Sequence, residues 1–270
     1  MIDILVLVLA GLIGGFLAGL LGIGGGMIYI LILPVALTKA GVPQEELVQY
    51  VIANSTLGTF FASVSGIATH IKTKTFYLRE TVFVGVAGAL TSLLMLTFVV
   101  NTPFYNRLIF NVVVVVFLIL ILLQGYLNRK KPIQTNDYQV SKLGMSLSGF
   151  LGGGMSALSG LGGGTIIVPL LSNYFKVDIK KAKSISIGMI LIATGSMAVF
   201  NFFESPRLPY EGAHVGYMIL SISLPMVVGV LISSPFGVKS SLRMSSTMLQ
   251  RIFTTFVLLV IVQKIVEIFS

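Results

Sequence analysis

The chain has 270 residues, of which 55% are hydrophobic and only 10% are charged, and its mean hydropathy is +0.98. About 20 apolar residues are needed to cross the hydrocarbon core of a bilayer, and the sequence contains several such stretches, which predicts an all-α protein that crosses the membrane several times. The chain has no Cys, which excludes disulfides and thiolate metal sites. Its net charge of +9 lies in short loops between apolar segments, which favours the positive-inside pattern over nucleic-acid binding.

Ten apolar segments follow one another along the chain. We expect six full membrane-spanning helices and two pairs of segments in which a glycine cluster separates a helix from a short partner. Each short partner has about 12 residues and covers roughly 18 Å at helical rise, too little for a bilayer. The expected full spans are 48–69, 81–100, 108–127, 184–203, 214–235 and 249–269, and the pairs are 4–21 with 27–38 and 143–159 with 165–175.

The two glycine clusters are copies of each other. GLIGGFLAGLLGIGGGMIYI, at 11–30, aligns with GFLGGGMSALSGLGGGTIIV, at 149–168, and places one glycine triplet on the other. Each glycine in a helix interior costs about 1 kcal/mol relative to Ala, so a triplet predicts a helix that breaks, exposes its backbone and restarts. The repeat divides the chain into halves at 1–128 and 140–270, joined by the polar linker 129–139.

The loop charges predict how the halves lie in the membrane. If each glycine-broken pair enters and leaves on the same side, the loops 70–80, 128–142, 176–183 and 236–251 lie together and hold 14 basic residues, against four on the other side. If the pairs crossed instead, the split would be nine to nine. The positive-inside rule therefore predicts a cytoplasmic linker and two outside termini in a bacterial-type inner membrane. Asp3 stands where a signal peptide would carry a basic residue, so no cleavable signal is expected.

This topology makes the two halves inverted repeats. Inverted repeats with broken helices are typical of secondary transporters, which bind their substrate near the middle of the membrane. The backbone N–H groups of the triplets, with the positive ends of the helices that follow, would suit an anion. For the earlier glycines spaced as GxxxG, such as Gly11, Gly15 and Gly19, close helix packing is favoured instead. The candidate substrate-binding glycines are Gly24, Gly25, Gly26, Gly162, Gly163 and Gly164.

Polar residues inside the apolar segments are further candidates. Asn54, Ser55 and Thr56 lie in the third segment, Ser186 occupies the place of Ser55 in the second half, and Thr165 follows the second triplet. Their side chains could donate hydrogen bonds to an oxyanion. The alternative is that such side chains bond to their own helix or to a neighbouring one. Both interpretations stay open for Ser55 and Ser186, and the structural one is favoured for Asn54 and Thr56.

Polar and ionisable residues are expected at the ends of the spans. His70, Asn201 and Glu204 end two matching helices, where placement at the interface is favoured over a proton-coupling role, and Arg107 and Arg251 are expected to anchor helix orientation. No Lys or Arg falls in the middle of a predicted span. We therefore expect no buried cation at the substrate site.

An enzyme is disfavoured. Ala157-Leu158-Ser159-Gly160 is similar to the G-x-S-G of intramembrane serine proteases, but Ala replaces the first Gly, and only His70 or His214 could serve as its base. The sequence has no P-loop and no His/carboxylate cluster, so neither a nucleotide nor a metal cofactor is expected.

The double glycine signature resembles the TauE/SafE family of sulfite exporters. GLLGIGGGMIYILILP at 19–34 and SGLGGGTIIVPLL at 159–171 carry the resemblance, which covers nearly the whole chain. The family's Gly-Thr-Ser is replaced by Ser184-Ile185-Ser186 and by Ala53-Asn54-Ser55. The resemblance implies transport of sulfite, sulfate, sulfoacetate or related small anions.

The expected function is therefore secondary transport, as an exporter, of a small sulfur-containing oxyanion by alternating access. The expected partners are this anion, protons as coupling ion, the lipid bilayer and a second copy of the chain in a homodimer. The alternatives are transport of another small anion or metabolite, and a membrane scaffold that transports nothing.

Overall fold

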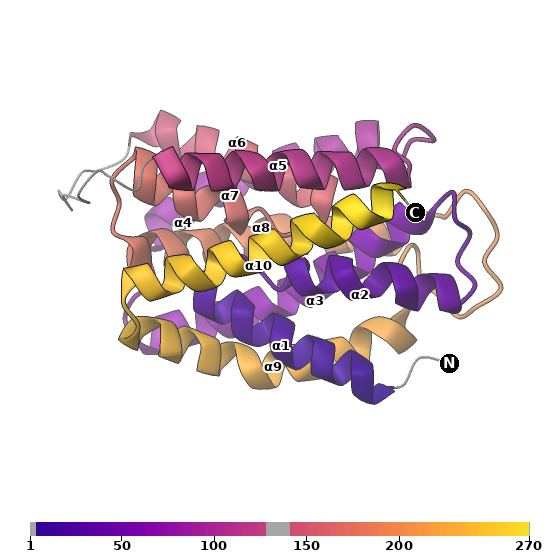
Figure 1. Cartoon of the computed structure of the whole chain (residues 1–270), viewed down its shortest axis with the longest axis horizontal. Coiled ribbons are helices and arrows are strands. Elements are labelled where there is room, and N and C mark those ends of the chain that lie inside the picture. The colour runs from indigo at the N-terminus through magenta and orange to yellow at the C-terminus, as the bar shows by residue number, and fades with distance from the viewer. Residues whose placement is uncertain (1–3, 128–140, 270) are drawn as a thin grey trace.

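The computed structural model describes residues 4–127 and 141–269, and the predicted linker 129–139 lies outside the described residues. The described residues form ten α-helices, two π-helical turns and one isolated β-bridge between Val215 and Met218. The prediction of an all-α protein is confirmed. Figure 1 shows the helices lying roughly along the long axis of the molecule, as expected for a bundle that crosses a bilayer.

The helices follow the predicted segments in order. In the first half these are α1 (Ile4–Leu21), α2 (Gly26–Lys39), α3 (Leu47–Lys72), α4 (Leu78–Met95) with the π-turn η1 (Leu96–Val100), and α5 (Arg107–Leu127). In the second half they are α6 (Lys142–Ser159), α7 (Gly164–Pro169) with the π-turn η2 (Leu170–Tyr174), α8 (Ile179–Phe203), α9 (Leu220–Arg243) and α10 (Ser246–Phe269).

Among the described residues, six helices are long and apolar enough to cross a membrane: α1, α3, α4 with η1, α8, α9 and α10. The chain is a multi-pass membrane protein. Five of these helices overlap with predicted full spans, and the sixth is α1, which was expected as the first arm of a broken pair and has 18 residues. The remaining predicted span is α5, with 21 residues.

The predicted span 214–235 has the wrong boundaries, because the helix there runs from Leu220 to Arg243. The backbone N–H of Tyr217 donates to the carbonyl of Asn201, Gly216 has a positive φ of 54°, and the N–H of Ile219 donates to the Asn54 side chain. These contacts hold 214–219 outside the helix. Hydropathy cannot register them, since the residues involved are apolar or small.

Small residues let two helix pairs approach closely. A Cβ added at Gly11 would overlap with the backbone of Met226, and one at Gly15 would overlap with the backbone of Val230, so α1 lies directly on α9 (Figure 1). In the second half, Gly149 and Gly153 of α6 lie in the same way on the backbone of α4. The packing role predicted for these glycines is confirmed. The same contacts leave no room for a side chain at Gly11.

Each glycine-broken pair turns back toward the end of the molecule where it starts. Figure 1 shows α1 beginning at the right-hand end, where α2 and α10 also end, while α6 begins at the left-hand end. The two breaks therefore approach the middle of the bundle from opposite ends. The residues that join the arms, 22–25 and 160–163, are buried.

Candidate functional site

The two glycine breaks touch each other in the middle of the bundle. A Cβ added at Gly26 would overlap with the carbonyl oxygen of Gly160, and one at Gly164 would lie against the carbonyl oxygen of Gly22. These two contacts are equivalent under the sequence repeat. Any side chain at Gly26 or Gly164 would push the two breaks apart, so the junction requires glycine at both places.

The backbone at the junction has left-handed conformations that favour glycine. Five glycines of the two breaks have φ between 68° and 88°. Gly160 ends α6 in this conformation, and Gly163 precedes α7 in it. The five residues are Gly22, Gly24, Gly160, Gly162 and Gly163.

The breaks leave backbone donors unused. Within the described part of the chain, the N–H groups of the two glycine triplets donate no hydrogen bond, although all six residues are buried. Orphaned buried N–H groups are rare in proteins, and in a membrane each is costly. The helices α2 and α7 begin at the same glycines and direct the positive ends of their backbones toward the junction. The junction is thus chemically suited to an acceptor with negative charge.

Two serines tie each break to the other half of the chain. The Ser55 hydroxyl of α3 donates to the carbonyl of Gly160 (2.8 Å), and the Ser186 hydroxyl of α8 donates to the carbonyl of Gly22 (2.7 Å). The structure therefore places both candidates at the junction, and at equivalent positions. Their donors are engaged with the backbone, so their direct role here is to hold the breaks in register.

Asn54 and Thr56 lie beside the junction and have other partners. The Asn54 amide donates to the carbonyls of Tyr50 and Tyr217 and accepts from Ser223 and from the Ile219 N–H. The Thr56 hydroxyl donates to the carbonyl of Ile52, one helical turn earlier. The structural interpretation favoured for both residues agrees with these contacts.

Two threonine hydroxyls are buried at the breaks. Thr165, predicted from its place after the second triplet, is fully buried, and its hydroxyl has no hydrogen-bond partner among the described residues. The same is true of Thr59 on α3, whose methyl group faces both Gly24 and Gly162. Sequence reasoning missed Thr59, although it lies one helical turn after Ser55.

A buried lysine lies next to the first break, where no cation was expected. The aliphatic part of the Lys183 side chain packs on Gly22. The residue is 3% exposed, and its Nζ donates a hydrogen bond to the carbonyl of Leu20 (3.3 Å). No carboxylate lies within ion-pair distance of it in the described part of the chain. Asp178 acts on it only at longer range and accepts hydrogen bonds from the first turn of α8.

The expectation of no buried cation is therefore wrong. It assigned Lys183 to a loop by charge alone, whereas α8 begins at Ile179 and carries Lys183 into the bundle. Asp178 could have indicated this helix start, because Asp is a preferred N-cap residue, whose side chain accepts hydrogen bonds from the N–H groups of the first helical turn. A buried lysine without a counter-ion is unusual, since burying an unpaired charge is costly.

The other ionisable candidates lie away from the junction or have different partners. His70 lies in the last turn of α3 and is 2% exposed; its Nδ1 pairs with the Thr75 hydroxyl (2.7 Å), and its ring is close enough to Lys183 to interact electrostatically, while its placement at the membrane interface stays a prediction. Arg251 is exposed on α10, as an anchor should be. Asn201 is buried near the end of α8, and Glu204 follows that helix.

The geometry gives no support to a serine protease. Ser159 donates to the carbonyl of Met155 and accepts from the N–H of Leu161, while His214 pairs with the carbonyl of Gly216. Among the described residues, no three His, Cys, Asp or Glu side chains lie close enough together to hold a metal ion.

Three known proteins similar to this chain are named probable membrane transporter proteins. A probable membrane transporter protein of Methanocaldococcus jannaschii is 29% identical, over 88% of this chain and 86% of its own length. Another from Haemophilus influenzae is 28% identical over 98% of both chains, and YunE, a probable membrane transporter protein of Bacillus subtilis, is 26% identical over 97% of both. The model of the family described as "Sulfite exporter TauE/SafE" matches residues 7–263. The chain belongs to the TauE/SafE family.

Proposed function

We propose that this protein is a secondary transporter that exports a small sulfur-containing oxyanion and binds it at the junction of the two glycine breaks. The observation that carries the proposal is the set of buried, unused N–H groups on the two triplets. A sulfite or sulfonate group presents several oxygen acceptors in a small volume, so it can accept from both breaks at once.

Lys183 supports the anionic character of the substrate. Its ammonium group is buried one helical turn before Ser186, which bonds the first break. A bound anion would supply the counter-ion that the described residues do not provide. The choice of a sulfur oxyanion rests on the family description and not on the geometry.

The mechanism we propose is alternating access between two inverted halves. Its support is that the main contacts occur in exchanged pairs: α1 packs on α9 as α6 packs on α4, and each break is bonded by the other half's serine. Rocking one half against the other would open the junction first to one end and then to the other.

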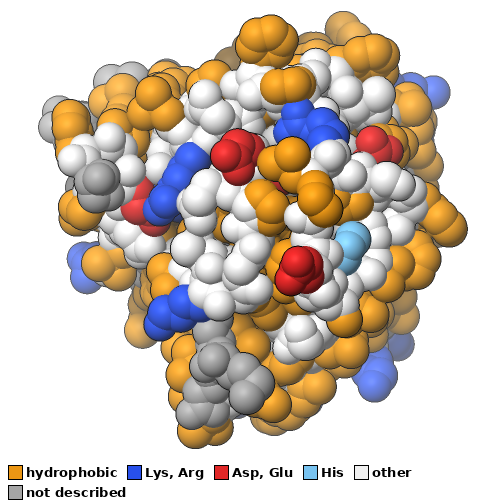
Figure 2. Space-filling view, turned by 90° about the vertical axis from the view of Figure 1, so that its right-hand side faces the viewer, with side chains coloured by type: hydrophobic (Ala, Val, Ile, Leu, Met, Phe, Trp, Pro, Cys, Tyr) orange, Lys and Arg blue, Asp and Glu red, His pale blue; other side chains and the backbone are white. Residues whose placement is uncertain are grey.

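The proposed orientation places the left-hand end of Figure 1 in the cytoplasm and both termini outside. Most of the basic residues of the described chain lie in the turns after α3, η2 and α9 or in the helix ends beside these turns, as the positive-inside rule requires. Figure 2 shows the opposite end, where acidic side chains are mixed with basic ones. Accessibility tags at both termini test this orientation, and a cytoplasmic N-terminus would contradict it.

The test of function is flux in proteoliposomes. We expect the purified protein to transport sulfite, sulfate, thiosulfate, sulfoacetate or another organosulfonate, and the same anion to raise its unfolding temperature. Repeating the flux at several pH values tests proton coupling. Transport of a neutral metabolite in preference to every anion would overturn the proposal. If nothing is transported and no anion raises the unfolding temperature, the result favours the alternative of a membrane scaffold.

A further inference from the structure

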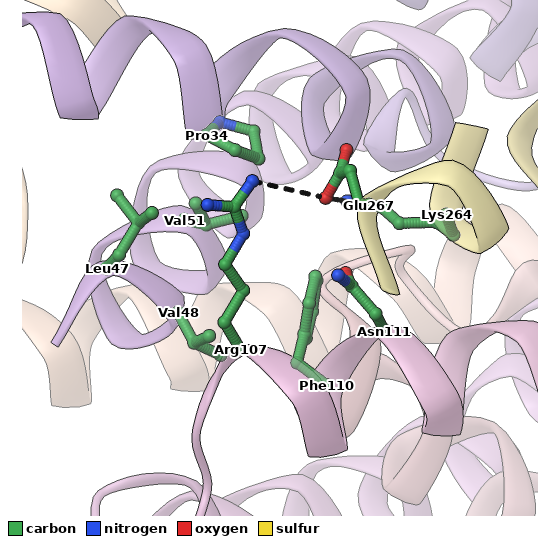
Figure 3. Close-up of a pocket in the computed structure, with 9 residues that line it drawn as sticks. All are labelled: Pro34, Leu47, Val48, Val51, Arg107, Phe110, Asn111, Lys264 and Glu267. Atoms are coloured by element: carbon green, nitrogen blue, oxygen red, sulfur yellow. Dashed lines mark hydrogen bonds and ion pairs between the residues drawn. The ribbon is translucent and has the colours of Figure 1, made fainter. Parts of the chain in front are cut away.

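A second polar cluster lies far from the glycine junction, near the end of the molecule where α10 ends. It fills the space between the start of α5 and the last turns of α10, and α2 and α3 close its other sides (Figure 3). The cluster consists of Arg107 and Asn111 from α5 with Lys264 and Glu267 from α10. Pro34 of α2 and Leu47, Val48 and Val51 of α3 supply apolar walls.

The cluster has more positive than negative charge. Glu267 pairs with Lys264 (2.9 Å) and, more loosely, with Arg107 (3.8 Å), and it also accepts a hydrogen bond from Gln263 (3.2 Å). Its carboxylate is thus fully engaged, and one positive charge remains uncompensated. Glu46, directly before α3, is paired with Arg207.

The positive charge is also buried. Lys264 is 0% exposed, and its Nζ lies 5.3 Å from the centre of the Phe110 ring. The 26-residue helix α3 begins at Leu47, one of the apolar residues that line the same space. Burial in an apolar wall strengthens the attraction of these groups for an anion.

An amide without partners points into this space. Asn111 is 1% exposed, and neither its Nδ2 nor its Oδ1 has a hydrogen-bond partner among the described residues. Figure 3 shows its tip directed between Phe110 and Lys264, toward the Arg107–Glu267 pair. Buried polar atoms are rarely left unpaired, so such an amide indicates a ligand or an ordered water.

The space fits a small ligand. Its cavity measures about 10 Å³ and is partly open to the outside. A cavity of this volume holds about one water. The Arg107 side chain at the mouth is 46% exposed, so it can turn outward and admit a slightly larger particle. A water would satisfy the amide but would leave the excess positive charge.

We propose that this hollow, formed by Arg107, Asn111 and Lys264, binds a small inorganic anion of about the size of chloride. The anion would accept hydrogen bonds from the guanidinium, the amide Nδ2 and the ammonium, and would balance the charge that Glu267 does not. Its site is separate from the glycine junction and does not depend on what the junction binds. By bridging α5 and α10, it would fasten the two final helices of the halves to each other.

The test compares chloride with gluconate, an anion too large for the hollow, at equal sodium concentration in detergent-purified full-length protein. A ligand at ten times its dissociation constant should raise the unfolding temperature of a protein of this size by about 3 °C. We expect this rise in the wild type with sodium chloride and its loss in Asn111→Leu, which has a similar volume and no polar atoms. Asn201→Leu, at a buried amide of α8, is the matched control and should keep the rise.

A second variant keeps the test decisive if Asn111→Leu folds poorly. Asn111→Asp places a fixed negative charge where the anion would bind, so it should be more stable than the wild type in gluconate and should show no response to chloride. A chloride response that is equal in the wild type and in Asn111→Asp would overturn the proposal, as would a wild type that does not distinguish chloride from gluconate. Anomalous scattering from bromide-soaked crystals should place one ion between Asn111 and Lys264, and an ion only elsewhere would contradict the site.

Discussion

The break between α1 and α2 and the break between α6 and α7 share two pairs of left-handed glycines, but Gly25 is right-handed (φ −73°) where its equivalent Gly163 is left-handed (φ 74°), and the side chains around the breaks differ. Against the first break lies the ring of Tyr29, and at the equivalent place in the second lies Ile167. Lys183 packs on Gly22, while its counterpart Ile52 packs on Gly160. The first break thus has a buried phenol and a buried cation near it, and the second has two aliphatic residues.

This difference shows which features both copies of the repeat must keep and which can differ between them. Backbone contacts between the breaks must be kept in both copies, because a change in either one separates both. The side chains around the breaks can differ, and the polar ones lie near the first break. A transported anion would then meet two unequal environments as it passes. Substitutions in matched pairs can test where the symmetry ends.

The largest expected effect is at the glycines. Gly163→Ala should abolish transport and lower the yield of folded protein, because the new Cβ would overlap with the Gly152 carbonyl at a φ of 74°. At the equivalent Gly25, the atoms nearest to a new Cβ belong to the Tyr29 side chain, so adding Tyr29→Leu to Gly25→Ala should restore transport. Proteoliposome flux and size-exclusion profiles measure both. Gly154→Ala, with only a distant methyl group of Thr91 nearby, is the control and should behave as wild type.

Next in size is the effect of Lys183→Met. Removing a buried charge that has no counter-ion should stabilise the empty protein by roughly 1–3 kcal/mol, while transport falls at least tenfold because the anion loses its cation. Thermal unfolding without substrate and flux with substrate give the two readouts. Lys180→Gln, at an exposed position on the same helix, should change neither. If Lys183→Met transports normally, the lysine serves only the end of α1, whose carbonyl it binds.

A third comparison concerns the starts of the two long helices. Glu46 precedes α3 and is fully buried, whereas Val177 lies at the equivalent place before α8. Burial alone would raise the pKa of Glu46, but hydrogen bonds from the Leu208 N–H, the Tyr217 hydroxyl and Arg207 hold this pKa below its usual value. The carboxylate thus fastens the loop 204–219 to α3.

A lowered pKa means that this stabilisation is present above the pKa of the unfolded chain and is lost as pH falls through the folded value. Glu46→Gln should therefore lower the free energy of unfolding by about 2 kcal/mol at pH 7, and the difference from wild type should shrink below about pH 4.3. Urea unfolding at pH 7, 5 and 4 measures it. A difference that is constant with pH would show that the charge is not involved.

The smallest expected effect is at the two serines, where the test is whether the two substitutions lower stability equally. Ser55→Ala and Ser186→Ala each leave one carbonyl of the opposite break without its donor, which costs roughly 1 kcal/mol. Matching losses in unfolding temperature would support the same role on both sides. A loss of transport in Ser186→Ala alone, at equal stability, would instead assign that hydroxyl to the substrate.

The sequence predicted the parts of this molecule that depend on local pattern. The helices, the two glycine breaks and the matching places of Ser55 and Ser186 follow from hydropathy and from the repeat. The acceptors of these serines could not be predicted, because the Gly160 and Gly22 carbonyls lie 105 and 164 residues away along the chain. Lys183 was missed because a lysine near the start of a helix looks the same in a sequence whether that part of the helix is buried or exposed.

The exchanged serine bonds also bear on how the protein is made. The carbonyl of Gly22 accepts its hydrogen bond from Ser186 of α8. The contacts of the first break therefore cannot all form until α8 has entered the membrane. During synthesis, the first half must persist with an open, polar backbone in the bilayer or delay its insertion until the second half follows. A first half expressed alone should therefore be degraded, and co-expression of the second half as a separate chain should rescue it.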